Sequence, residues 1–337
     1  MKVRQEVYDT YWKFAAERQE IFFKRILDYP QPWTKDEILK THKFCNTYRA
    51  SDRVSQYLIK NVIYSGIENE EDVIFRIILF KIFNKIETWQ LLEQEIGDIR
   101  LSTFDFDRYS QILQYSIDIG KPIYTNAYMS CANKVFGYEK KHQNHLALIE
   151  QMFIKDKIVK TICSSPNMET TFKFLQKYPL IGNFMAYQLV TDINYSEVVD
   201  FSEQSFTVVG PGSQRGIKKC FYDIGNKSYE DVIKWMCENQ DKEFDRLGIQ
   251  FKNLWGRPLQ YIDCQGLFCE TDKYCRAAFP ELKSNRKRIK AKFQINNQEI
   301  DFFYPPKWNI NDKVKETLLL RKEALPKMNQ QQLLLTF

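Results

Sequence analysis

The chain has 337 residues, of which 44% are hydrophobic and 15% aromatic, and it contains only 12 glycines and 11 prolines. This composition excludes wholesale disorder and favours helices joined by short loops over a strand-and-turn sandwich. The formal net charge of +6 is compatible with a polyanionic partner but does not by itself identify one.

Apolar residues recur at helical spacing through most of the chain. The spacing predicts helices over 7–27, 34–42, 44–64 and 71–88, and near 105–119, 143–162, 168–178, 183–193, 228–239 and 271–277. Thr34 and Glu37 predict a capping box at the start of the second helix. The alternating segment 291–304, with Asn296–Asn297 between its halves, predicts a β-hairpin, and a short helix is expected near 311–324.

We therefore expect a mainly α protein with a helical core over 1–285 and a C-terminal extension over 286–337 that holds the small β-hairpin. The most apolar stretch, 73–89, is interrupted by four charged residues, so it predicts a buried helix at the centre of a lobe rather than a membrane span. The N-terminus lacks the apolar segment of a signal peptide, and we expect a cytoplasmic protein.

The segment LQKYPLIGNFMAYQLVTDINYSEVVDF, residues 175–201, gives the most informative local pattern. A first helix ends near Tyr178, a tight turn reaches Gly182, and a second helix begins at Asn183, which together predict a helix–hairpin–helix over about 168–194. Gly182 and the helix N-terminus at Asn183 would let the backbone approach and bind a DNA phosphate. An ordinary helical corner explains the same spacing.

Two carboxylates, Asp192 and Asp200, follow this turn. The segment resembles the helix–hairpin–helix DNA glycosylases, which place a catalytic aspartate shortly after the second helix, and the resemblance implies a two-lobed helical fold of that kind. Asp200 lies slightly short of the expected position, whereas Asp192 is nearer to the turn and would share one polar helix face with Gln188 and Tyr195. A solvated helix end for Asp192 and an N-cap for Asp200 are the competing interpretations.

A glycine-bearing loop in the second half of the chain is a candidate phosphate-binding segment. It contains Gly210, Gly212 and Ser213, and Arg215 and Lys218 follow. A plain turn explains it as well, and no GxxxxGK[ST] nucleotide-binding loop is found in the sequence.

The predicted helix over 44–64 carries a basic stripe. Arg49 and Arg53 lie on this stripe as candidate phosphate-binding residues, and Tyr48 is a candidate wall for a base. A solvated helix face is the usual explanation for such a stripe.

The eight cysteines are scattered without a CxxC pair, and we expect reduced thiols. Cys264, Cys269 and Cys275 do not reproduce the four-cysteine iron–sulfur loop that some glycosylases carry. We therefore expect no metal and no cofactor.

Several ordered segments resemble the alpha-glutamyl/putrescinyl thymine pyrophosphorylase family, which also occurs as the helical domain of 5-hydroxymethyluracil DNA kinases. These segments are FCNTYRASDRVSQYL (44–58), LFKIFNK (79–85), YQLVTDINYS (187–196), the GPGS loop, and DCQGLFCETDKYCR (263–276). The resemblance covers roughly 8–281 and implies DNA carrying modified pyrimidines as the partner. Because no P-loop is found, we do not expect the kinase fusion itself.

Our first hypothesis is a DNA glycosylase that flips out a modified pyrimidine, cleaves its N-glycosidic bond and serves in defence against phage. Asp192 or Asp200 would stabilise the positive charge that develops on the sugar. The candidate base-binding residues are Gln188, Asn194, Tyr195, Tyr48, Asn84 and Glu270. The candidate phosphate-binding residues are Gly182, Asn183, Arg49, Arg53, Gly210, Gly212, Ser213, Arg215, Lys218 and Lys273.

Two alternatives remain open. The first is a transferase that joins an amino acid or amine to an activated 5-hydroxymethyl pyrimidine in DNA and displaces pyrophosphate, for which cations must bind the leaving group. Six cations are candidates for that role: Lys85, Arg215, Lys218, Lys219, Lys273 and Arg276. The second is a module that binds modified DNA without chemistry, which should leave the DNA unchanged.

Overall fold

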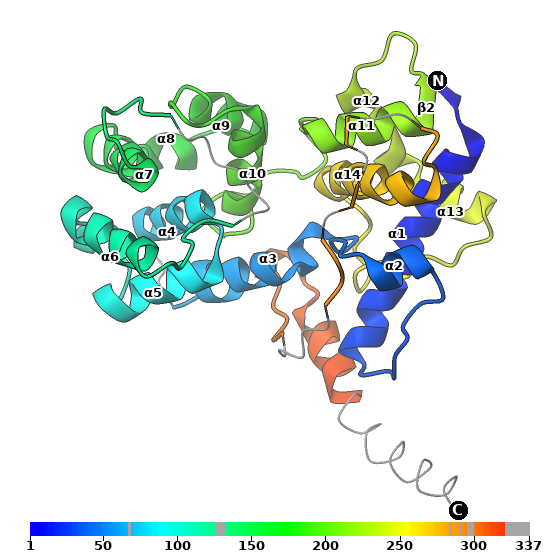
Figure 1. Ribbon diagram of the computed structural model, residues 1–337, viewed down its shortest axis with the longest axis horizontal. Coiled ribbons are helices and arrows are strands. Elements are labelled where there is room, and N and C mark those ends of the chain that lie inside the picture. The colour runs from blue at the N-terminus through cyan, green and yellow to red at the C-terminus, as the bar shows by residue number, and fades with distance from the viewer. Residues whose placement is uncertain are drawn as a thin grey trace, which may run out of the picture. The chain divides into compact units, whose positions relative to one another are not determined.

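The computed structural model describes residues 1–66, 69–125, 133–282, 285–286, 288–289, 291–294 and 300–320. The chain forms two compact units: unit 1 comprises Met1–Asp52 and Val209–Phe337, and unit 2 comprises Arg53–Val208. The two ends of the chain therefore contribute to one unit, and its middle forms the other (Figure 1). Both units consist mainly of helices, which confirms the expected fold class at that level.

Unit 1 is organised around one long helix, α14 (Tyr261–Ala278). The other helices of the unit are α1 (Gln5–Ile26), α2 (Glu37–Thr41), α11 (Pro211–Cys220), α12 (Tyr229–Glu238) and α13 (Gln240–Arg246), with 3-10 turns at Arg49–Ser51 and Pro306–Trp308 and a further helix over 311–320. Helices α1, α11 and α12 all pack against α14. Strands β1 (Lys2–Val3) and β2 (Phe221–Asp223) pair antiparallel, with Lys2 opposite Asp223.

Two glycines bring α11 close to α14. A Cβ atom on Gly216 would lie 2.0 Å from the carbonyl oxygen of Phe268, and one on Gly212 would lie 2.3 Å from Sγ of Cys269. A larger residue at Gly216 would force the two helices apart, and one at Gly212 would displace the Cys269 side chain. Gly212, a glycine of the predicted phosphate loop, and Gly216 therefore have a packing role, because they allow the side chains of α11 to reach those of α14.

Unit 2 is built around α4 (Glu70–Phe83), which is buried along almost its whole length, as its apolar sequence predicts. Helices α7, α8 and α10 pack on it. The remaining helices are α3 (Arg53–Tyr57), α5 (Ile86–Ile96), α6 (Phe106–Asp118), α7 (Lys141–Glu150), α8 (Val159–Cys163), α9 (Met168–Leu175) and α10 (Asn183–Ile193), with π-helical turns at Leu58–Ile63 and Gln151–Lys155 and a 3-10 turn at Leu101–Thr103.

Several predicted boundaries differ from the observed ones. The predicted helix over 71–88 is two helices, because Asn84 adopts a left-handed conformation with φ 48° and ends α4. The predicted helix over 44–64 begins only at Arg53, apart from one 3-10 turn. Helix α2 is capped by Asp36, whose Oδ1 accepts hydrogen bonds from two backbone amides, and not by the capping box that begins at Thr34.

The predicted C-terminal hairpin lies partly outside the described residues, since its turn at Asn296–Asn297 is among those not described. Within 291–294 and 300–304 no strand is present, and Lys292 instead forms an isolated antiparallel bridge with His42. The described part of the predicted extension packs on unit 1, where the Tyr304 and Ser51 hydroxyls hydrogen-bond at 2.9 Å. None of the helices in the described ranges has both the length and the apolarity required to cross a bilayer.

Candidate functional site

In unit 2, the first candidate acid forms a buried ion pair. Helix α10 carries Asp192 and α4 carries Lys81, with 2.9 Å between Nζ and Oδ2, and the two side chains are 0% and 4% exposed. Asp192 is therefore not at a solvated helix end. Gln188 and Tyr195, which were predicted to share its polar face, are buried as well. Asp200, the second candidate acid, is exposed, so the two acids are in very different environments.

Two further candidate base-binding residues in unit 2 have local structural roles. The side-chain amide of Asn194 donates to the carbonyl of Phe201 at 3.0 Å and accepts from its backbone N–H at 2.8 Å, which closes the loop after α10. Asn84 is the left-handed residue that ends α4. Both side chains are buried.

Helices α9 and α10 pack together and are joined by a short turn, so the two helices of the predicted helix–hairpin–helix are present. Gly182 is the N-cap residue of α10, with φ −84° and ψ 176°, an extended conformation that any residue can adopt. A Cβ atom added to Gly182 would meet no atom within 4 Å, so neither the backbone nor the packing requires glycine here. The left-handed residue of the turn is Leu180, with φ 68°. Gly182 and Asn183 are both exposed, which leaves their predicted contact with phosphate a prediction.

In unit 1, three cations surround one buried carboxylate. Oδ2 of Asp272 lies 3.1 Å from Nε of Arg215 and 2.6 Å from Nη2 of Arg276, and Oδ1 lies 3.1 Å from Nζ of Lys219. Asp272 is 0% exposed. Burial alone would raise the pKa of Asp272, but its hydrogen bonds to Arg276 and Lys219 outweigh that effect and lower it. With the carboxylate ionised, the cluster has a formal charge of plus two. We call these four residues the Asp272 cluster.

A second set of charged groups lies on the neighbouring turn of α14. Oε2 of Glu270 accepts hydrogen bonds from the backbone N–H of Cys45 at 3.0 Å and from Nζ of Lys273 at 2.6 Å. Nζ of Lys273 also lies 4.5 Å from the ring centroid of Phe44. The charges of Lys273 and Arg215 both act on the thiol of Cys269, so this set and the Asp272 cluster adjoin.

Asp52 is the carboxylate of this region with a raised pKa. Burial raises it to about 6, against the lowering effect of a hydrogen bond from the Asn46 backbone and of the charge on Arg18. The backbone N–H of Asn46 donates to Oδ1 of Asp52 at 2.8 Å. The negative charges of Asp52 and Glu270 in turn raise the pKa of Cys45.

The remaining predicted residues of unit 1 mostly support the fold of this region. Gly210 caps α11, and the Ser213 hydroxyl donates to the carbonyl of Gln265 at 2.8 Å. The Tyr48 ring is buried and its hydroxyl donates to the carbonyl of Arg257, so it does not offer an exposed face to a base. Lys218 is exposed on α11.

The predicted basic stripe is divided between the units. The backbone N–H of Arg49 donates to Oδ1 of Asp263 in unit 1, whereas Arg53 belongs to unit 2 and pairs with Glu87 at 3.7 Å. The two arginines therefore do not form the single helical stripe that the sequence predicts.

The sequence reasoning missed Asp272 and Lys81. The sequence contains a spacing pattern that points to the Asp272 cluster. Arg215 and Lys219 are four residues apart, as are Asp272 and Arg276, so each pair shares one helix face. The segments that carry the family resemblance also gather in space: 44–52, 210–213 and 263–276 meet in unit 1, and 79–85 and 187–196 meet in unit 2 through Lys81 and Asp192.

Comparison with known proteins identifies a family that covers most of the chain. Residues 5–284 match the family described as the helical domain of 5-hmdU DNA kinase. The chain belongs to this family. A curated relative, the 5-hmdU DNA kinase of Bacillus phage SP10, is 27% identical over 326 residues, which cover 89% of this chain and 50% of the relative. The chain thus spans about half the length of that relative. No solved structure matches it.

These matches correct the first functional hypothesis. A kinase is a transferase, whereas a DNA glycosylase is a hydrolase, so the interpretation of the chain as a glycosylase that removes a modified base in phage defence is wrong. The finer prediction of a glycosylase-like fold is not supported by any matching solved structure. Within the described ranges, no group of three or more His, Cys, Asp and Glu side chains is arranged to hold a metal ion.

Proposed function

We propose that this chain is the DNA-binding and base-binding part of a transferase that acts at the 5-hydroxymethyl group of uracil in DNA, and that the Asp272 cluster binds phosphate carried by that group. The family match supports the substrate class. The observation that carries the proposal is the surplus of cations in unit 1, where three cations share one carboxylate.

A cluster with this charge favours an anionic ligand. Lys219 and Asp272 are almost fully buried and pair with each other. Asp272 also pairs with Arg215, which is the more accessible cation, with its side chain 19% exposed. Arginine binds phosphate oxygens through two parallel hydrogen bonds, and the N-terminus of α11 adds the positive end of a helix dipole. Lys273, 21% exposed on the neighbouring turn of α14, is a second cation that a phosphate can reach.

The proposed step uses phosphate that is already on the base. The nitrogen of an amine or amino acid attacks the methylene carbon attached to C5 of the pyrimidine. A C–N bond forms, the C–O bond breaks, and pyrophosphate leaves with the electron pair. The amine loses one proton, for which Asp52, with a pKa of about 6, is a suitable acceptor.

The test is to incubate the protein with DNA containing 5-hydroxymethyluracil, bearing either a free hydroxyl or a pyrophosphate, together with a panel of amines. We expect release of pyrophosphate and an increased nucleoside mass, without abasic sites. Arg215→Gln should lower the rate by about 10- to 100-fold, the usual effect of losing one charge-assisted hydrogen bond. The matched control is Lys218→Gln, which removes an exposed cation from the same helix.

Two results would contradict the proposal. One is a nucleoside mass that stays unchanged with every amine. The other is an Arg215→Gln variant that is as active as the Lys218→Gln control.

A further inference from the structure

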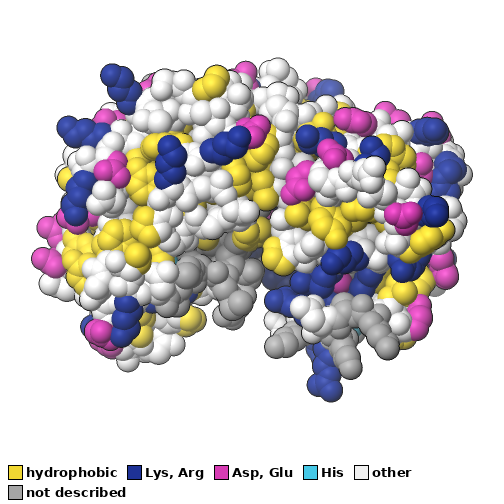
Figure 2. Space-filling model, turned by 90° about the horizontal axis from the view of Figure 1, so that it is seen from above, with side chains coloured by type: hydrophobic (Ala, Val, Ile, Leu, Met, Phe, Trp, Pro, Cys, Tyr) yellow, Lys and Arg dark blue, Asp and Glu magenta, His cyan; other side chains and the backbone are white. Residues whose placement is uncertain are grey.

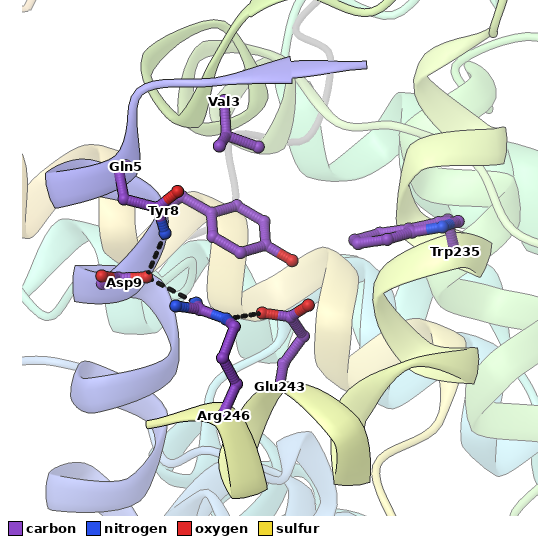
Figure 3. A pocket seen from close by; sticks show the side chains of 7 residues that line it. All are labelled: Val3, Gln5, Tyr8, Asp9, Trp235, Glu243 and Arg246. Atoms are coloured by element: carbon purple, nitrogen blue, oxygen red, sulfur yellow. Dashed lines mark hydrogen bonds and ion pairs between the residues drawn. The ribbon is translucent and has the colours of Figure 1, made fainter. Parts of the chain in front are cut away.

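Unit 1 contains a surface pocket away from the Asp272 cluster. It has a volume of about 330 Å³ and is lined by Val3, Gln5, Tyr8, Asp9, Trp235, Glu243 and Arg246 (Figure 3). These residues come from β1, α1, α12 and α13, and none of them belongs to the segments on which the proposed function depends. The volume is at the small end of the range for ligand pockets, roughly 300–1,000 Å³.

The polar side of the pocket has a surplus negative charge. One guanidinium, that of Arg246, pairs with two carboxylates: Nη2 lies 2.5 Å from Oδ1 of Asp9, and Nε lies 2.8 Å from Oε2 of Glu243. Glu243 is nearly buried, and Gln5 also donates to Oδ1 of Asp9. The formal charge of these groups is minus one, which disfavours an anionic ligand.

Tyr8 and Trp235 supply the aromatic part of the lining, and Cζ of Arg246 lies 5.7 Å from the centroid of the Tyr8 ring. The rings of Tyr8 and Trp235 lie 6.4 Å apart between centroids, tilted by 48°. Tyr8 is 3% exposed, and its buried hydroxyl has Trp12 and Glu243 nearby but makes no hydrogen bond of good geometry to the described residues. Figure 3 shows this hydroxyl directed into the space between Glu243 and Trp235. Burial raises the pKa of Tyr8, the neighbouring Trp12 indole lowers it, and the nearby Glu243 raises it further, so the phenol keeps its proton at neutral pH.

We propose that this pocket binds a primary alkylammonium ion. Aromatic faces attract an organic cation through their quadrupole, and a carboxylate beside them adds Coulomb attraction. A primary ammonium can donate to two acceptor groups of the pocket, the Tyr8 hydroxyl and the Glu243 carboxylate. Binding supplies the hydrogen bond that the buried hydroxyl lacks. The site is independent of the proposed transferase reaction, because it uses no member of the Asp272 cluster.

The experiment is calorimetric titration of the full chain with butylammonium chloride at constant ionic strength. We expect saturable binding that sodium chloride does not reproduce. Tyr8→Phe keeps the ring and removes only the hydroxyl, and it should weaken binding about fivefold, the usual effect of one neutral hydrogen bond. Glu243→Gln should weaken it about tenfold or more, since it removes the charge as well. Two variants should leave binding unchanged: Tyr222→Phe, an exposed tyrosine of the same unit, and Arg215→Gln.

Tetramethylammonium separates hydrogen bonding from simple attraction to the rings, because it has no N–H group. We expect it to bind at least about fivefold more weakly than butylammonium. Equal binding of the two ions, or equal butylammonium binding by wild type and Tyr8→Phe, overturns the proposal. So does a titration without saturable heat. If Glu243→Gln does not fold, the Tyr8→Phe result still decides.

Discussion

The two units contain buried carboxylates that differ in how their charge is balanced. In unit 2, Asp192 pairs with Lys81 across 2.9 Å, and both side chains are at most 4% exposed. In unit 1, Asp272 is equally buried but is shared by three cations, of which Arg215 is 19% exposed. Figure 2 shows Lys and Arg side chains gathered in one group on part of unit 1, whereas cations and carboxylates are more mixed over most of the rest of that face.

This difference supports the proposal that the phosphate-binding charge lies in unit 1. In the buried pair the charge of the lysine offsets that of the carboxylate, and removing either partner would leave an uncompensated charge inside the fold. A carboxylate shared by three cations cannot neutralise them all, so the remaining charge is available to an anion. The proposed phosphate site therefore lies in unit 1, and the catalytic role predicted for Asp192 stays a prediction.

The largest expected effect is on the buried pair of unit 2. Lys81→Met should lower the free energy of unfolding of this unit by about 3–5 kcal/mol, because it leaves the charge of Asp192 buried without its lysine. The double variant Lys81→Met/Asp192→Leu should recover most of that loss, since both charges are then absent. Urea unfolding monitored by circular dichroism measures both. If the double variant is no more stable than the single one, the unpaired charge of Asp192 is not the cause of the loss.

The next largest effect is on the contact between α11 and α14. Gly216→Ala should destabilise unit 1 by about 1–3 kcal/mol or more, because the new Cβ meets backbone atoms of Phe268 that cannot move aside. Gly212→Ala should cost less, since it meets the Cys269 side chain, and Cys269→Ala should rescue it by removing the sulfur atom. Thermal unfolding measures both variants. A Gly212→Ala variant that Cys269→Ala fails to rescue would contradict the close approach.

The contrast between the units was only partly predictable from the sequence. Helix positions were predictable because apolar spacing determines which face is buried, and α10 begins and ends where the spacing predicts. The break at Asn84 was not, because a left-handed residue inside an apolar run leaves no mark on the spacing. The length of α14 was not predicted either, because polar residues such as Asp263 and Asp272 interrupt its apolar spacing. In the structure these residues are buried, since charged or capping groups partner them.

The candidate site was less predictable than the fold. Arg215 and Lys273 were expected to bind phosphate, but the sequence does not reveal that Asp272 holds Arg215 from 57 residues further along the chain. Long-range ion pairs depend on tertiary packing, which neither spacing nor composition encodes. For the same reason the sequence does not reveal that Lys81 lies beside Asp192.

A pH experiment sharpens the comparison within unit 1. Asp272 has a lowered pKa, so it stabilises the fold at neutral pH and loses that contribution only as the pH falls below its ordinary value of 3.8. Asp52 has a pKa raised to about 6, so the folded state takes up its proton first, and its contribution to stability rises as the pH falls from 6 toward 3.8. Carbon-13 NMR of the aspartate carboxyls should show one group titrating near pH 6 that Asp52→Asn removes. If that group instead titrates near 4, Asp52 is not buried as described.

The smallest expected effect serves as the matched control for the glycine contacts. Gly266 also lies in α14, but a Cβ on it would meet no atom within 4 Å. Gly266→Ala should therefore stabilise the protein by about 0.4–1 kcal/mol, because alanine restricts the unfolded chain and favours the helix. Thermal unfolding beside Gly216→Ala gives the comparison directly, since the two substitutions add the same methyl group to neighbouring helices. Opposite signs are expected because only Gly216 lies where α11 and α14 approach closely, and a loss of stability at both positions would mean that α14 tolerates no added volume anywhere along its length.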